Sequence, residues 1–239
     1  MCIQYLCAMY KKIVRPLLFL LDAERAHHLV FALLGVATRI PGVTRLLRAM
    51  YGYEHPALGK KLFGLHFPNP IGLAAGFDKD ARLIDGLAAF GFGFIEVGTL
   101  TPRPQPGNDK PRLFRLPADG ALINRMGFNN AGAAAAAVRL KESNTKIIIG
   151  GNIGKNKVTP NAQAFDDYEI LQDTKTDGVI ATNTTIARTG LATNADALAA
   201  IGNGGLSGKP LTRHSTEVIR YLRQQLGKDF PIIGVGGIM

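Results

Sequence analysis

A lysine stands directly after an apolar stretch of the chain, where its ammonium group could reach a bound substrate. Lys79 follows Ala74-Ala75-Gly76-Phe77-Asp78, and a lysine just beyond a buried strand can pair with a substrate carboxylate. The position also suits an ordinary surface lysine beside Asp78 and Asp80, and position alone slightly favours that interpretation. Lys79 is therefore a candidate binding residue with a plain structural alternative.

A second candidate site is a short run that combines amides with an arginine. Residues 124–130 read N-R-M-G-F-N-N, with three amides and one arginine. Such a set suits a polar, planar ligand that carries amide groups. A loop whose asparagines bond to their own backbone would have the same composition. The stretch Thr182-Asn183-Thr184-Thr185 has the same two interpretations.

Glycine clusters offer backbone N–H groups for an anion. The glycines fall into three groups: Gly150-Gly151, Gly204-Gly205 with Gly208, and Gly234 with Gly236-Gly237. The last group follows a predicted strand, and the phosphate site of an α/β barrel commonly lies after its last strands. None of the groups is the G-x-G-x-x-G fingerprint of a dinucleotide site. The pattern allows phosphate binding and does not indicate a dinucleotide cofactor.

The histidines and cysteines predict no metal site. The five histidines lack metal-ligand spacing, and the two cysteines, Cys2 and Cys7, have no companions of the kind zinc needs. Two cysteines so close to one end cannot staple a fold, which favours a reducing compartment.

The elements that would position these residues alternate between strand and helix. Short apolar runs flanked by glycine predict five buried parallel strands, at residues 71–75, 94–99, 146–150, 178–182 and 231–235. Helical stretches are expected at residues 81–90, 130–141 and 215–226. This alternation predicts an α/β fold with a parallel sheet or barrel.

Each predicted strand ends in small or polar residues, among them Gly98-Thr99 and Gly151-Asn152. The carboxyl ends of barrel strands carry the active site. Turn chemistry alone would also place Gly and Asn there. Five such ends in succession favour a ligand site. The loop over residues 101–115, rich in proline and basic residues, is either functional or a stiff solvated excursion.

The N-terminal region reads as helical and basic. Asp22 is a suitable N-cap for a helix whose apolar residues share one face. Residues 1–61 hold nine basic and three acidic residues, a large part of the chain's net charge of +10. Such a segment suits an anionic membrane surface, or it packs on the protein's own core. Nucleic-acid binding is disfavoured, because the charge lies in an apolar helical segment without a reading motif.

Taken together, these segments resemble the dihydroorotate dehydrogenases of the membrane-associated, quinone-dependent class. They occur in the family's order and cover nearly the whole chain. The matching stretches are D-A-E-R-A-H-H at 22–28, N-P-I-G-L-A-A-G-F-D-K-D at 69–80, G-F-G-F-I-E-V-G-T at 91–99, T-P-R-P-Q-P-G-N-D-K-P-R at 101–112, N-R-M-G-F-N-N at 124–130, N-I-G-K-N-K at 152–157, D-G-V-I-A-T-N-T-T at 177–185, G-G-L-S-G at 204–208 and G-V-G-G-I at 234–238.

The resemblance implies a (β/α)₈ barrel that binds FMN and oxidises dihydroorotate to orotate in de novo pyrimidine biosynthesis, with a membrane quinone as electron acceptor. Residues 1–61 would be the helical segment for membrane attachment and quinone access, with the membrane surface meeting residues 1–50. Residues 62–239 would form the FMN-binding barrel. The expected location is the cytoplasmic side of a bacterial inner membrane, as a peripheral membrane protein.

Residue roles follow from the resemblance by position. The positions that match the FMN site are Ala75, Gly76, Thr99, Asn152, Thr182, Gly208 and Gly237. Those that match the substrate site are Lys79, Asn124, Arg125, Met126, Gly127, Phe128, Asn183 and Thr184. No metal is implied.

The chain departs from the family pattern between residues 172 and 177 and after residue 239. The part beyond the N-terminal segment has roughly 180 residues, against about 250 in a typical barrel of this type. Strands 4, 5 and 8 are therefore expected to be missing. The segment that carries the family's catalytic serine base is absent too, so no catalytic residue is assigned. The alternative function is an inactive, internally deleted remnant that keeps membrane binding.

Overall fold

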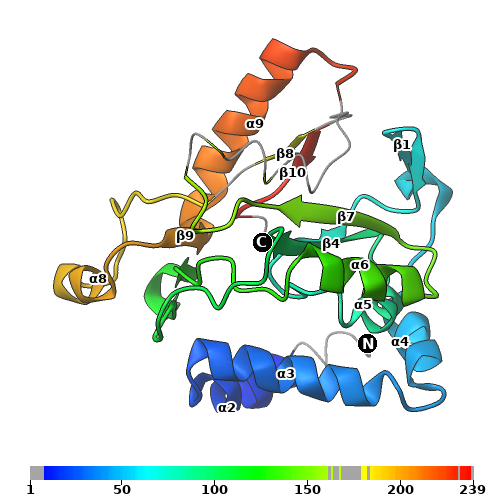
Figure 1. The fold of residues 1–239 in the computed structure, drawn as a ribbon, viewed down its shortest axis with the longest axis horizontal. Helices are drawn as coiled ribbons and strands as arrows, with labels where there is room; N and C mark the ends of the chain where they lie inside the picture. Colours follow the sequence, from blue (N-terminus) through cyan, green and yellow to red (C-terminus); the bar gives the residue numbers. More distant parts are fainter. Residues whose placement is uncertain are drawn as a thin grey trace. The chain divides into compact units, whose positions relative to one another are not determined.

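The computed structural model describes residues 8–160, 163, 167, 179–181, 184–230 and 232–237. The chain divides into two compact units (Figure 1). Unit 1 comprises Met1–Gly107 and Gly127–Asp173, and unit 2 comprises Asn108–Met126 and Thr174–Met239. The predicted division into a membrane segment and a barrel, at residues 1–61 and 62–239, stays a prediction.

Helices open unit 1, as the sequence predicts. A π-helical turn, η1 (Tyr10–Val14), leads into α2 (Arg15–Phe19), and α3 (Ala23–Ala37) and α4 (Val43–Tyr51) follow. The Asp22 carboxylate accepts the backbone N–H groups of Glu24 and Arg25, each at 3.0 Å, which confirms the predicted N-cap. None of the described helices is long and apolar enough to cross a membrane.

The main sheet of unit 1 is parallel, in the order β3-β4-β7. Its strands are β3 (Gly72–Leu73), β4 (Phe94–Leu100) and β7 (Ile148–Ile153), with Gly72 opposite Phe94 and Phe94 opposite Ile148. The predicted strands at 71–75, 94–99 and 146–150 are thus confirmed, with shifted ends. A small antiparallel hairpin precedes them, made of β1 (Lys60–Leu62) and β2 (Leu65–Phe67) after the short turn η2 (Pro56–Leu58).

Two helical segments connect these strands. The first is α5 (Ile84–Leu87) with the 3-10 turn η3 (Ala88–Phe90), and the second is α6 (Ala133–Glu142). Both begin three residues later than predicted. Before α5, Asp78 holds a tight turn with its side chain. Before α6, Gly132 has a φ of 87°, which is not helical.

The core of unit 1 lies between β4 and these helices. Ile95 and Val97 are fully buried and join a cluster with residues of α5 and α6. Phe31 and Leu34 of α3 pack against the same cluster. One face of α3 therefore packs on the protein's own core. This is one of the two interpretations of the N-terminal segment, the other being contact with a membrane surface.

Unit 2 combines an antiparallel sheet with a parallel strand pair. The antiparallel sheet has the order β5-β6-β9, with β5 (Leu113–Leu116), β6 (Ala121–Asn124) and β9 (Gly205–Gly208). The parallel pair is β8 (Val179–Ala181) with β10 (Ile232–Gly234), which confirms the last two predicted strands. The helices are α8 (Ala195–Ile201) and α9 (Thr212–Leu226), and short 3-10 turns lie at η4 (Pro117–Asp119) and η6 (Lys209–Leu211).

The antiparallel sheet corrects one part of the sequence analysis. The sequence predicts a loop over residues 101–115, but the last three of these residues belong to β5. Leu116, Ile123 and Leu206 form a small buried cluster under this sheet. These residues form a strand because β5 pairs with β6, which in turn pairs with β9. The local sequence pattern does not predict this pairing.

Candidate functional site

Polar side chains meet at the carboxyl end of the parallel sheet of unit 1. Glu96 lies in the middle of β4 and is 6% exposed. Its carboxylate accepts the Ala75 backbone N–H at 3.1 Å and the Asn152 side-chain amide at 2.9 Å. The Asn152 side-chain oxygen accepts the Thr99 hydroxyl at 2.6 Å. Three of the predicted cofactor residues, Ala75, Thr99 and Asn152, are therefore brought together by this network.

Glu96 is the residue that the site analysis from sequence missed. A buried carboxylate is costly unless several donors satisfy it, and here a backbone N–H and a side-chain amide do so. The only available signal was an acidic residue inside the apolar run Phe94-Ile95-Glu96-Val97. Such a residue orders its partners and fixes where the Asn152 amide points.

Gly76 lies beside this network with space above it. Its φ is 107°, and no atom lies within 4 Å of the place where a Cβ would stand. Its N–H donates to the Gly98 carbonyl at 2.9 Å, which holds this turn on the end of β4. The backbone here is thus fixed while its outer face is open, an arrangement that lets a ligand approach closely.

Lys79 is partly buried and has a defined partner. Its ammonium group donates to the Asn129 side-chain oxygen at 2.6 Å. The neighbouring Asp78 is 1% exposed and accepts the backbone N–H groups of Asp80, Arg82 and Leu83. Asp78 thus sets the turn that presents Lys79. A freely solvated surface lysine would not have these features.

The amide run is held mostly by bonds to the backbone. In unit 2, Asn124 accepts the Met126 N–H at 2.8 Å, and the Arg125 guanidinium donates to the carbonyls of Pro111 and Ile201 at 3.0 and 2.7 Å. Arg125 also lies over the Phe114 ring at 5.0 Å. The alternative interpretation, asparagines that bond to their own backbone, therefore accounts for Asn124. Arg125 is held instead by carbonyls outside the run.

The rest of the run lies in unit 1. The carbonyls of Gly127 and Phe128 accept the Gln105 side-chain amide, at 3.0 and 3.2 Å. The Phe128 side chain is 52% exposed. An exposed aromatic ring on a backbone that is held at both of these carbonyls is available to cover a flat ligand.

The predicted residues of unit 2 are described in part. Thr182 and Asn183 lie outside the described residues, whereas Thr184 is exposed. Gly208 and Gly237 have φ values of 98° and 69°. A Cβ on Gly208 would stand 2.9 Å from the Cα of Ala121, and one on Gly237 would stand 2.6 Å from the Cα of Thr212. Close approach of two backbones thus requires glycine at both positions, whatever else they bind.

His27 of α3 packs beside the turn that carries Lys79. Its ring meets the Phe77 ring edge to face, with centroids 5.2 Å apart. Burial lowers the pKa of His27 below its usual 6.5, and the nearby charges of His28 and Lys79 lower it further, against smaller raising effects of Glu24 and Asp78. The folded chain therefore prefers neutral His27.

This preference predicts a stability that depends on pH. Because the pKa is lower in the folded chain, the unfolded chain binds the proton first as the pH falls through about 6.5, and stability then decreases. We expect His27→Gln to lose less stability between pH 7.5 and pH 5.5 than the parent chain does, measured by urea unfolding. His66→Gln, at an exposed histidine of β2, is the control and should keep the parent's pH dependence. Equal pH dependence in all three proteins would contradict the assignment.

The described residues contain no group of three or more His, Cys, Asp or Glu that could hold a metal ion.

Comparison with known proteins gives consistent matches. A family model described as dihydroorotate dehydrogenase matches residues 57–171 and 155–239. A "Dihydroorotate dehydrogenase (quinone)" of Christiangramia forsetii is 45% identical over 303 residues, covering 96% of this chain and 87% of the relative. A protein of the same name from Thermobifida fusca is 38% identical, covering 96% and 81%. The crystal structure of a ligand-free DHODH from Eimeria tenella is similar with a TM-score of 0.74 and 29% identity, covering 91% of this chain and 83% of that one.

Proposed function

Because this chain belongs to the dihydroorotate dehydrogenase family, we propose that it oxidises dihydroorotate to orotate in pyrimidine biosynthesis, with a quinone as electron acceptor. The observation that carries the proposal is the network at the strand ends, where Ala75, Thr99 and Asn152 converge on Glu96. The similarity to the Eimeria tenella DHODH structure supports an α/β barrel-type fold for this chain.

The proposed cofactor is FMN, and the residues at the strand ends fit it. Gly76 offers an open backbone cradle, and the Thr99 hydroxyl and Asn152 amide offer polar groups beside it. We assign these residues and Ala75 to the flavin, together with Thr182, Gly208 and Gly237 of unit 2. When bound, FMN would supply the redox chemistry between dihydroorotate and quinone.

The proposed substrate residues supply charge and hydrogen bonds. Lys79 would pair with the substrate carboxylate, and its bond to Asn129 orients the ammonium group. The resemblance also assigns the run 124–128 together with Asn183 and Thr184 to the substrate. Arg125 would have to give up bonds to two carbonyls to contact substrate directly, so its proposed role is to hold the loop.

We further propose that an internal segment of the family barrel is missing from this chain. The alignment with the C. forsetii relative runs over 303 positions, more than the 239 residues of this chain. The family model also matches in two pieces, residues 57–171 and 155–239, which overlap over residues 155–171. Both facts support the absence of strands 4 and 5.

The inactive-remnant alternative is not favoured by these comparisons, since the relatives that carry the enzyme's name match over most of their length.

Membrane attachment through residues 1–50 remains part of the proposal, with a location on the cytoplasmic side of a bacterial inner membrane. Leu33 and Val36 of α3 are 59% and 63% exposed, and Leu20 after α2 is 82% exposed. Exposed apolar side chains in a segment with a basic excess, nine basic against three acidic residues over 1–61, suit a surface rich in anionic lipid. No nucleic-acid partner is proposed.

The test is the flavin content of the purified 239-residue chain. We expect close to one released FMN per chain after reconstitution with excess cofactor. Asn152→Ala removes one donor to Glu96 and one polar group at the strand ends, so it should weaken FMN binding by about tenfold or more. Asn144→Ala, at an exposed asparagine of the same unit, is the matched control and should bind like the parent.

Two outcomes would count against the proposal. One is failure of the parent chain to retain any FMN after reconstitution. The other is equal binding by all three proteins, which would place the flavin away from this network. Thermal unfolding of each chain without cofactor separates a binding defect from a folding defect.

A further inference from the structure

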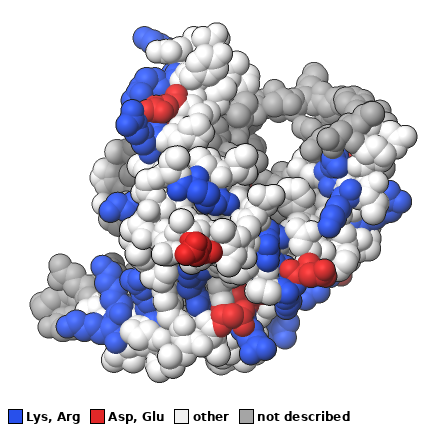
Figure 2. All heavy atoms as spheres, turned by 90° about the vertical axis from the view of Figure 1, so that its left-hand side faces the viewer, with Lys and Arg blue, Asp and Glu red and all other residues white. Residues whose placement is uncertain are grey.

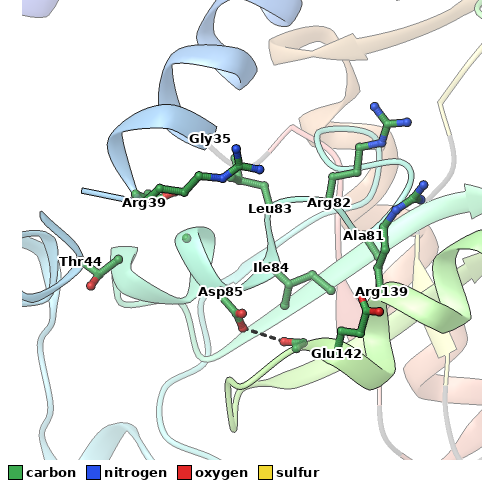
Figure 3. A pocket seen from close by; sticks show the side chains of 13 residues that line it. Gly35, Arg39, Thr44, Ala81, Arg82, Leu83, Ile84, Asp85, Arg139 and Glu142 are labelled. Atoms are coloured by element: carbon green, nitrogen blue, oxygen red, sulfur yellow. Dashed lines mark hydrogen bonds between the residues drawn. The ribbon is translucent and has the colours of Figure 1, made fainter. Parts of the chain in front are cut away.

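A cavity of about 410 Å³ lies in unit 1 between the N-terminal helices and the helices over the sheet (Figure 3). Gly35, Thr38 and Thr44 line it from the side of α3 and α4, and Ala81–Gly86 line it from the start of α5. None of the residues proposed above for flavin or substrate lines it. The cavity is therefore available to a different ligand.

Three arginines from three parts of the chain line this cavity. Arg39 follows α3, Arg82 precedes α5 and Arg139 belongs to α6. In Figure 3 the side chains of Arg82 and Arg139 extend in the same direction, and that of Arg39 extends toward Leu83. Three guanidinium groups around one space are typical of sites that bind phosphate or carboxylate in a bidentate manner.

The guanidinium groups of these arginines have N–H donors that form no hydrogen bond with the described part of the chain. Within the part of the chain that the structure describes, the Arg39 side chain has no hydrogen-bond or ionic partner. One guanidinium nitrogen of Arg139 donates to the Asp80 backbone carbonyl at 2.8 Å. Arg82 lies 3.9 Å from the Asp80 carboxylate, at the limit of an ion pair, and its side chain is 57% exposed. Such a contact is weak.

The acidic residues of the cavity do not cancel this charge. Asp85 already accepts the Ser143 hydroxyl at 2.7 Å and the backbone N–H groups of Asn144 and Thr145. In Figure 3 the Asp85 carboxylate lies away from Arg82. Glu142 is the other acidic residue that lines the cavity, so three arginines stand against two carboxylates and the lining carries a net charge of +1. The Asp80 carboxylate, 3.9 Å from Arg82, lowers the positive charge near that arginine.

We propose that this cavity binds a phosphate group. Its volume exceeds that of a bare phosphate and lies in the range of small-molecule pockets, so the phosphate should carry a small organic group. Two sources have this chemistry: the headgroup of an anionic phospholipid and a soluble phosphate ester. Figure 2 shows Lys and Arg on one face of the molecule, and the net charge of +10 would attract either anion to the chain as a whole.

A stripe of exposed apolar residues favours the lipid source. Leu29, Leu33, Val36 and Ile40 are 42–63% exposed and recur at helical spacing along α3 and just after it. The same segment carries Gly35, Thr38 and Arg39 of the cavity. The stripe lies on a different face of the helix from Gly35 and Thr38, so it would rest on the membrane near the end of α3 that leads to Arg39, where a phosphate headgroup could meet the arginines. This lipid source rests on the proposed membrane attachment, whereas binding of a soluble phosphate does not.

The experiment compares two double variants with equal loss of charge. Arg39→Gln/Arg82→Gln removes two cavity arginines. Arg220→Gln/Lys228→Gln removes two exposed positive charges that lie outside the cavity and outside residues 1–50. The probes are glycerol 3-phosphate, by calorimetry, and phosphatidylcholine vesicles with or without phosphatidylglycerol, by flotation. All are measured with the full chain, and circular dichroism verifies that each variant folds.

Loss of two bidentate contacts should weaken binding of at least one phosphate probe by about tenfold or more. The Arg220→Gln/Lys228→Gln variant should stay within about twofold of the parent. Weaker binding of glycerol 3-phosphate would identify a soluble ester as a ligand, and an effect confined to phosphatidylglycerol vesicles would identify the lipid headgroup. Glu142→Gln removes a negative charge from the rim and should strengthen binding of the same probe.

Equal behaviour of the two double variants toward both probes would overturn the proposal, because the effect would then be general surface charge. The readout is binding rather than turnover. Failure of this site therefore leaves the proposed enzymatic function untouched, and absence of flavin or turnover leaves this site untouched.

Discussion

Turnover of dihydroorotate by this chain is expected to be about 10²- to 10⁴-fold slower than that of its C. forsetii relative, the range typical for loss of a general base. Oxidation to orotate removes a hydride and a proton, and the resemblance implies a serine as the proton acceptor. On the proposed internal deletion, the segment that would carry that serine is missing between residues 172 and 177. The remaining residues would still bind and orient the substrate, so activity should be reduced rather than abolished.

The measurement is kcat at saturating dihydroorotate and quinone, normalised to the bound flavin of each protein. A small added base, such as imidazole or formate, should accelerate this chain more than the relative, because it replaces the missing proton acceptor. Equal kcat values without added base would contradict the prediction and show that another residue takes the proton. Normalisation to flavin keeps this result independent of cofactor affinity.

Replacement of Asp78 with alanine is expected to lower the free energy of unfolding by about 3 kcal/mol or more. The Asp78 side chain is buried and accepts three backbone N–H groups, the shortest at 2.7 Å from Leu83. Alanine would leave these donors in a buried turn without an acceptor. The same turn presents Lys79, so the variant should also bind substrate more weakly.

Urea unfolding of Asp78→Ala against Glu54→Ala tests this prediction. Glu54 lies in an exposed stretch before η2, and its replacement should change stability by no more than about 0.5 kcal/mol. Similar unfolding midpoints for the two variants would show that the Asp78 turn does not contribute as its bonds suggest.

The sequence was informative about the site where residue types and strand ends coincide. Thr99 and Asn152 each follow an apolar run, and parallel strands bring such ends to one edge, where the structure finds these residues bonded to each other. Glu96 was missed because an acidic residue inside an apolar strand has no local partner in the sequence. Its partners lie 21 and 56 residues away along the chain.

The amide run shows the opposite case. Its composition suggests a ligand site. In the structure, however, the Asn124 side chain accepts a backbone N–H and the Arg125 side chain donates to backbone carbonyls. Nothing in seven consecutive residues distinguishes a loop that binds a ligand from a loop that binds itself. The distinction depends on carbonyls at Pro111 and Ile201, which only folding brings to the guanidinium group.

The sequence by itself determined what is local: the five parallel strands with their polar ends, the Asp22 cap of α3 and the order of the family motifs. These follow from apolar periodicity and from side chains that bond within a few residues. Only the tertiary structure decided the antiparallel sheet of β5, β6 and β9, the network around Glu96 and the arginine-lined cavity. Each of these joins residues that are far apart along the chain, so the pairing becomes visible only once the chain has folded.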